Sequence, residues 1–172
     1  MTTDHTGHAS HTDYEDLTEC SLSPDRESEL VNTARECVFM WANRAGEPFG
    51  VVMSYLPKDG VLWLTAAERR ARISAIRRFP RAAVCINSSG TGIGGGRTVT
   101  YKGSCTVRDD RATKNWFYPE FARRLRPDSE HAATVFQDFL DSEHRVIIEF
   151  VPDYSLSFDA ELMWARSPEA TS

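Results

Sequence analysis

The sequence predicts an α+β fold, mainly β, in which an antiparallel sheet curls into a barrel with helices appended to it. Short apolar strands follow one another through turns at residues 44–48 and 57–60, where Pro and Gly stand at positions typical of tight turns. Helical patterns occur mainly at the third crossover and before the last strands. A doubly wound parallel sheet would need regular alternation of strands and helices, which this chain lacks.

The first third of the chain predicts one helix and three strands linked by hairpins. The helix has Pro24 near its start, acids in its first turn, and Leu30 and Val31 on one side. The strands are apolar runs bounded by turn residues. We expect the helix over residues 24–34 and the strands over residues 37–43, 49–55 and 61–65.

The middle of the chain predicts a helix over residues 66–80, with Ile73, Ala75 and Ile76 facing inward and Pro80 just beyond its end. Two strands follow, separated by a glycine-rich segment that predicts a flexible loop. The strands are expected over residues 82–87 and 98–107, and the loop over residues 88–96.

The last third predicts helices followed by the final strands. Residues 109–126 are expected to form one or two helices interrupted at Pro119, because proline lacks the N–H that a helix interior requires. The next helix, residues 128–142, is expected to turn Val135, Phe136, Phe139 and Leu140 inward. The last strands are expected over residues 145–151 and 155–158.

Length and composition set the class of protein. A chain of 172 residues fits one domain with its own core, and a hydrophobic share of 41% excludes a wholly disordered chain. No apolar run approaches the roughly 18 residues that cross a membrane, and the first ten residues lack the basic and apolar parts of a secretory signal. We therefore expect a cytoplasmic protein with no membrane partner.

The net charge of −5 is unevenly divided along the chain. Residues 1–30 carry eight acids and one base, whereas the other 142 residues carry 17 acids and 19 bases. A general nucleic-acid binder would show a wider basic excess, so no nucleic-acid partner is expected. The pattern predicts a disordered acidic tail over residues 1–25, a folded domain over residues 26–165 and a short tail over residues 166–172.

The sequence does not support a metal site, a dinucleotide-binding motif or a hydrolase site. The cysteines have no C-x-x-C spacing, and three of them lie in apolar strand-like runs, so we expect reduced structural thiols and no metal site. The glycines of residues 90–95 match a dinucleotide fingerprint by letter, but a strand follows them where that motif requires a helix. No G-x-S-x-G occurs, which argues against a hydrolase, and we nominate no catalytic side chain.

The strongest local signal is T-A-A-E-R-R-A-R, residues 65–72. A strand is expected to end at Thr65 and a helix to begin within a residue or two, so unpaired backbone N–H groups would favour a phosphate. Arg70 and Arg72 would add cationic forks. Six arginines and no acid stand between Arg69 and Arg81. The alternative is a solvated basic helix face.

Residues 46–86, GEPFGVVMSYLPKDGVLWLTAAERRARISAIRRFPRAAVCI, resemble the pyridoxamine 5'-phosphate oxidase-like, split β-barrel flavin and deazaflavin proteins. Residues 99–107 with Asp109 and Asp110 resemble the family's next strand, and the resemblance runs from about residue 33 to residue 162. The matching positions in the arginine-rich part are Thr65, Arg70, Arg72, Arg77, Arg78, Pro80 and Arg81.

The resemblance implies a six-stranded split barrel, usually a homodimer, with flavin in two clefts at the subunit interface. Arg72 stands where Lys is more usual, and the C-terminal pyridoxal-phosphate motif of the true oxidases is not evident, which argues against oxidation of vitamin B6. The cofactor phosphate would be held by Thr65, Ala66, Arg70 and Arg72, and the isoalloxazine would lie against Val52, Met53 and Ser54.

The expected function is a flavin-dependent oxidoreductase that exchanges hydride between flavin and a small organic substrate. FMN is the first choice of cofactor and the deazaflavin coenzyme F(420) the second. Two alternatives stay open: a non-catalytic flavin or haem binder on the same scaffold, and an interaction domain with acidic partners. The aromatic residues Trp116, Phe117, Tyr118 and Phe121 either wall the substrate pocket or serve ordinary helix packing.

Overall fold

The structure of the chain, a computed structural model, describes residues 17–166, and its seven strands there form one antiparallel sheet. The end strands β2 and β3 are separated by Tyr55 alone and are two halves of one bent strand. The first half pairs with β1 and the second with β4, which closes a six-stranded antiparallel barrel, as predicted. The sheet order is β2-β1-β5-β6-β7-β4-β3, with β1 (Glu36–Ala42), β2 (Pro48–Ser54), β3 (Leu56–Lys58), β4 (Val61–Ala67), β5 (Arg81–Asn87), β6 (Arg97–Arg108) and β7 (Arg145–Asp159).

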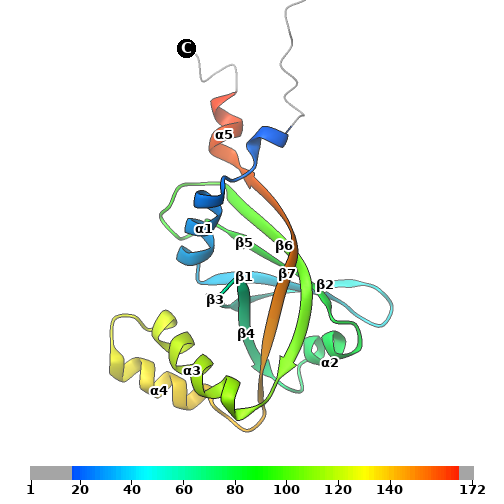
Figure 1. Cartoon of the computed structure of the whole chain (residues 1–172), viewed down its shortest axis with the longest axis vertical. Coiled ribbons are helices and arrows are strands. Elements are labelled where there is room, and N and C mark those ends of the chain that lie inside the picture. The colour runs from blue at the N-terminus through cyan, green and yellow to red at the C-terminus, as the bar shows by residue number, and fades with distance from the viewer. Residues whose placement is uncertain (1–16, 167–172) are drawn as a thin grey trace, which may run out of the picture.

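The helices lie outside the barrel, also as predicted. Figure 1 shows α1 and α5 at one end of the long β6–β7 ribbon and α3 and α4 towards the other end. Within the described part of the chain, no helix is long and apolar enough to cross a membrane. The helices are a 3-10 turn (Thr18–Cys20), α1 (Pro24–Thr33), α2 (Ala71–Arg78), α3 (Arg111–Leu125), α4 (Glu130–Leu140) and α5 (Ala160–Ala165).

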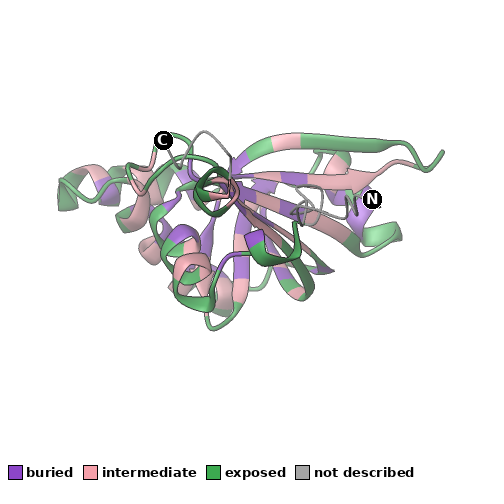
Figure 2. Ribbon diagram, turned by 90° about the horizontal axis from the view of Figure 1, so that it is seen from above, coloured by how far each residue is buried: buried purple, intermediate pink, exposed green. Residues whose placement is uncertain are grey.

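The barrel interior is filled by alternate residues of the strands, because successive side chains of a strand point to opposite faces. On β4, Leu62, Leu64 and Ala66 are buried in the core, while Trp63 and Thr65 face outward. Figure 2 shows the buried segments gathered where the strands cross. The predicted inward face of α2, Ile73 with Ala75 and Ile76, is buried as well.

A second apolar cluster joins α3 and α4 to the outside of the barrel. Phe117, Tyr118 and Phe121 are buried there against Leu140 and Ile147, so these aromatic residues serve helix packing. The interruption expected at Pro119 is wrong, since α3 is continuous from Arg111 to Leu125. The burial of three aromatic side chains outweighs the single helix hydrogen bond that a proline removes.

The N-terminal boundary of helix α2 differs from the prediction. Strand β4 continues to Ala67 and the helix begins at Ala71, five residues later than expected. Pairing with β7, where Ala66 lies opposite Val146 and Ala67 opposite Arg145, holds this alanine pair in the sheet. A non-local ladder here overrides the helix preference of alanine.

Helix α4 buries a different face from the one predicted. Leu140 is buried and Phe136 half-buried, but the side chains of Val135 and Phe139 are exposed, the latter by 71%. Residues four apart share a helix face. Because Ala133 is buried, the inward face holds Ala133, Phe136 and Leu140, while Val135 and Phe139 share a neighbouring face.

The two strands expected at the C-terminal end are one strand, β7. The register with β6 shifts where Lys102 faces Tyr154 and Gly103 faces Pro152, so Asp153 is the extra residue of a bulge. The bulge accommodates the proline, which cannot donate to a ladder.

Residues 17–25 belong to the folded domain, in contrast to the predicted tail. Cys20 and Leu22 are buried, and the Leu22 N–H donates to Ser157 Oγ at 3.0 Å. On α1, Arg26 pairs with the fully buried Asp159 at the end of β7. These contacts are non-local, so composition alone could not reveal them. The rest of the predicted tail, residues 1–16, and residues 167–172 lie outside the described residues.

Acid should weaken the start of α3 through Asp110. This N-cap carboxylate accepts hydrogen bonds from Thr113 N and Oγ1, both at 2.8 Å, and these bonds lower its pKa. A pKa lower in the folded than in the unfolded chain gives a contribution that is present above the unfolded value of about 3.9 and lost as pH falls through the folded value. Urea unfolding at pH 7 and pH 3 should show a smaller acid loss for Asp110→Asn, which keeps a cap acceptor. An equal acid loss in variant and wild type would contradict this assignment.

Candidate functional site

The first part of the candidate site is the end of β4. Thr65 faces outward under α3, and its hydroxyl donates to the Val146 carbonyl at 3.0 Å while lying 3.5 Å from the Tyr118 hydroxyl. Its one proton is therefore engaged within the fold. The side chain of Ala66 faces the barrel core, so only its backbone is available to a ligand.

The second part is a group of three arginines around the turn from β4 into α2, which we call the guanidinium cluster: Arg70, Arg72 and Arg145. Arg70 is the exposed N-cap residue of α2, and Arg72 lies in its first turn. Arg145 begins β7 opposite Ala67. Arg145 is not among the predicted site residues, because its proximity to Arg72 follows only from the register of β4 against β7.

The charges of the guanidinium cluster are not neutralised by the fold. Within residues 17–166, none of its three members forms an ion pair, and Arg72 Nε is buried without a hydrogen-bond partner. Burial lowers the pKa of Arg72, and the charges of Arg70 and Arg145 lower it further. A buried donor among like charges is costly unless an anion accepts a hydrogen bond from it, so the cluster suits a phosphate or carboxylate group.

Two other arginines of the predicted basic stretch are neutralised by acids from elsewhere. Arg77 pairs with Glu68 at 2.8 Å, and Arg81 pairs with Asp153 of the β7 bulge. Although residues 69–81 contain no acid, Arg77 and Arg81 are therefore both paired in the folded protein. Within the described residues, these pairings leave Arg70 and Arg72 unpaired at the start of α2, where the sequence predicts the phosphate.

Strand β2 places the remaining predicted residues on two faces. Met53 is buried in the barrel core, which corrects its assignment as an isoalloxazine contact. Val52, 65% exposed, and Ser54 line an outer cavity of about 880 Å³. Neither Thr65 nor the guanidinium cluster lines it; the cavity's other walls include Arg35, Asn87, Ser89, Leu125, Arg126 and Phe136.

The glycine-rich segment of residues 88–96 is packed on α5. A side chain at Gly96 would place its Cβ 2.4 Å from Ala160 Cβ, and one at Gly94 would meet Glu161. The segment is closed by Ser88 N–H donating to the Arg97 carbonyl at 2.9 Å. It therefore joins β5 to β6 as a loop held by close approach, and it contributes Ser89, Gly90 and Thr91 to the outer cavity.

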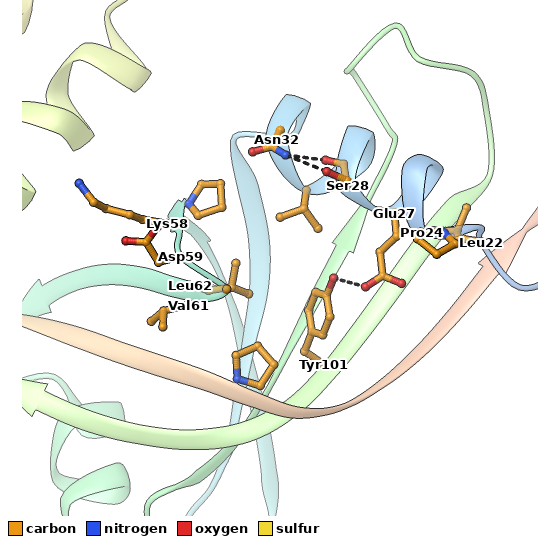
Figure 3. A pocket seen from close by; sticks show the side chains of 14 residues that line it. Leu22, Pro24, Glu27, Ser28, Asn32, Lys58, Asp59, Val61, Leu62 and Tyr101 are labelled. Atoms are coloured by element: carbon orange, nitrogen blue, oxygen red, sulfur yellow. Dashed lines mark hydrogen bonds between the residues drawn. The ribbon is translucent and has the colours of Figure 1, made fainter.

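A second cavity, of about 670 Å³, lies beside α1 and is shown in Figure 3. It is bounded by α1, the β3–β4 turn, Tyr101 of β6 and Pro152 of β7. Glu27 and Asp59 line it, and the Tyr101 hydroxyl donates to Glu27. Its acidic lining is unfavourable for a phosphate, which distinguishes it from the guanidinium cluster.

Two of the thiols, Cys37 and Cys105, do not supply a reactive group. Burial is the main cause that raises the pKa of both Cys37 and Cys105 to about 12, so both are protonated at neutral pH. All four cysteines are free, and among residues 17–166 no group of three or more metal-ligating side chains occurs.

Comparisons with solved structures support the fold. A conserved hypothetical protein, Rv2991, from Mycobacterium tuberculosis has 19% identity and a TM-score of 0.68, covering 80% of this chain and 85% of its own. A putative pyridoxamine 5'-phosphate oxidase from Listeria innocua has 16% identity and a TM-score of 0.59, covering 77% and 95%. An F420 reductase has 18% identity and a TM-score of 0.58, covering 75% and 94%. No family model and no curated protein matches the sequence.

Proposed function

We propose that this chain, which has the split-barrel fold found in a putative pyridoxamine 5'-phosphate oxidase and an F420 reductase, is a flavin-dependent oxidoreductase with FMN as its cofactor. The observation that carries the proposal is the buried, unpartnered Arg72 Nε beside Arg70 and Arg145. A phosphate monoester supplies the acceptor and the negative charge that this cluster lacks.

The chain's own residues hold and orient the cofactor. Arg70 and Arg72 grip the phosphate from the start of α2, whose free N–H groups add positive potential. Arg145 brings a third guanidinium from β7. Val52 and Ser54 line a cavity that the cluster does not reach within one chain, so they would face the ring system across the subunit interface of the homodimer proposed below. A bound flavin supplies hydride exchange with the substrate, so no side chain is needed as acid or base for that transfer.

The deazaflavin coenzyme F(420) is the second candidate. Arg69 and Arg78 are exposed at the two ends of the α2 region, and within the described residues neither forms an ion pair. Together with the guanidinium cluster they suit a cofactor with a longer anionic tail than FMN. The likeness to an F420 reductase agrees with this candidate.

Titrating the purified protein with FMN and separately with the deazaflavin, followed by fluorescence quenching, tests the proposal. A tight complex that NAD(P)H reduces supports the enzyme. Flavin bound without turnover of any electron acceptor favours a carrier or sensor, and a Soret band in the purified protein favours haem. A colourless protein that binds neither cofactor overturns the proposal and favours the alternative function, an interaction domain with acidic partners.

We also propose a homodimer that covers the outer face of the barrel. Directly opposite residues of neighbouring strands place Val52, Val38, Cys85, Thr100 and Leu156 in one row across five strands. Both ends of this row are open, because Val52 and Leu156 are each 65% exposed. A largely apolar row of this extent, with Thr100 as its polar member, is typical of a protein interface.

The substitution Leu156→Glu should convert the dimer to a monomer of 19.4 kDa, since a charge buried in an apolar interface has no partner. Light scattering measures the mass. The matched control is Val135→Glu, an exposed residue of α4 outside the row, which should leave the mass at twice that value. A wild-type protein that is monomeric at all concentrations contradicts the homodimer proposal.

A further inference from the structure

The cavity beside α1, which we call the α1 pocket, has preformed walls. Its volume of about 670 Å³ falls in the range of small-molecule sites. Three prolines fix its backbone: Pro24 at the start of α1, Pro57 in β3 and Pro152 at the β7 bulge. Val31, Val61 and Leu62 add apolar surface.

One side of the pocket carries the carboxylate of Glu27, which forms no ion pair within residues 17–166. The hydroxyl of Tyr101 donates to Glu27 Oε1 at 2.5 Å, and Figure 3 shows the two side chains pointing toward one another. Burial and this bond raise the pKa of Tyr101, so the phenol stays neutral and remains the donor to Glu27. The neighbouring Arg26 is directed to Asp159 and Glu161 instead.

The opposite side of the pocket adds a second acid, and its lysine is already engaged. Lys58 Nζ lies 2.6 Å from Glu120 Oε1 and 4.8 Å from the centre of the Trp116 ring, and Figure 3 shows it pointing away from Glu27. Asp59 stands in the β3–β4 turn with a positive φ of 53° and, within residues 17–166, forms no ion pair. The pocket is therefore apolar in its walls and negative in its charge.

We propose that the α1 pocket binds a small organic cation, an ammonium group on a compact apolar body. The ammonium pairs with Glu27 and lies near the Tyr101 ring, while the apolar body packs against Val61 and Pro57. None of the residues assigned above to flavin binding lines this pocket, so the inference does not depend on the proposed function.

Calorimetry with three probes that share a phenylethyl body tests the charge preference at pH 7: 2-phenylethylamine, 2-phenylethanol and 3-phenylpropanoate. The amine should bind at least about tenfold more tightly than the alcohol, because a charged hydrogen bond adds to the same apolar contact. The carboxylate should bind most weakly. Equal affinity for amine and alcohol overturns the proposal, and this arm needs no variant.

The variant Glu27→Gln locates the site. Glutamine keeps an acceptor for Tyr101 but removes the charge, so the amine should lose at least about tenfold in affinity while the alcohol is unchanged. The matched control is Asp25→Asn, an exposed acid of the same helix outside the pocket, which should bind like wild type. An equal loss in both variants, or displacement of the amine by saturating FMN, contradicts the proposal.

Discussion

Replacing Arg72 with alanine is expected to weaken FMN binding by about 1.5–3 kcal/mol, roughly ten- to more than a hundredfold, because a charge-assisted contact in a partly dry cleft is lost. Arg70→Ala should have an effect of the same order. Riboflavin, which lacks the phosphate, should bind both variants as it binds wild type. Fluorescence quenching of the two ligands measures the difference.

The stability of the ligand-free protein separates a binding role from a structural one. Arg72 Nε is buried without a partner and repelled by Arg70 and Arg145, so its removal should leave the free protein as stable as wild type or slightly more stable. The matched control is Arg78→Ala, an exposed arginine at the far end of α2, which should leave FMN affinity nearly unchanged. Equal, small effects at Arg70, Arg72 and Arg78 would show that the arginines form only a solvated face.

Arg145→Ala tests the residue that the sequence analysis did not find. If its guanidinium contributes to the phosphate site from β7, its loss should lower FMN affinity while sparing riboflavin, as for Arg72. A loss of affinity for both ligands would instead indicate that the change disturbs the β4–β7 ladder, where Arg145 faces Ala67.

The second large effect is expected at Gly103, where β6 meets the β7 bulge. A Cβ at this position would lie 2.2 Å from the Val151 carbonyl oxygen and 2.8 Å from Phe150 Cζ. Because the closest obstacle is backbone, the strands must separate, and Gly103→Ala should cost about 2–4 kcal/mol of unfolding free energy. Thermal unfolding should then move down by roughly 5–15 °C.

Gly95→Ala is the matched control for Gly103. No atom lies within 4 Å of a Cβ built at Gly95, and its φ is outside the left-handed region. The variant should therefore change stability by less than about 0.5 kcal/mol, or raise it slightly by restricting the unfolded chain. A Gly103→Ala protein as stable as Gly95→Ala would mean that the bulge is loosely packed, contrary to this structure.

Local patterns in the sequence were enough for most strands and for the inward face of α2. The alternation in β4 and the spacing of Ile73 and Ile76 show which side chains are buried. This pattern depends only on the periodicity of the strand or helix itself. The turn at Asp59–Gly60 is local in the same sense, because few residues accept a positive φ there. These features follow from contacts between residues close in the chain.

The features that the sequence analysis misjudged depend on partners distant in the chain. Pairing with β7 keeps Ala66 and Ala67 in a strand and delays α2 to Ala71. Packing on the barrel keeps α3 continuous through Pro119 and decides that Phe139 faces outward. In each case a non-local contact outweighs a local preference of about 1–3 kcal/mol.

The candidate site shows the same division. The sequence by itself determined that cations gather at the start of α2, because Arg70 and Arg72 are neighbours in the chain. Only the tertiary structure decided that Arg145 joins them, that Glu68 and Asp153 neutralise Arg77 and Arg81, and that Met53 faces the core. The physical reason is that an uncompensated charge depends on every group folded near it, and two of these groups, Arg145 and Asp153, come from β7, which begins more than 60 residues after α2 ends.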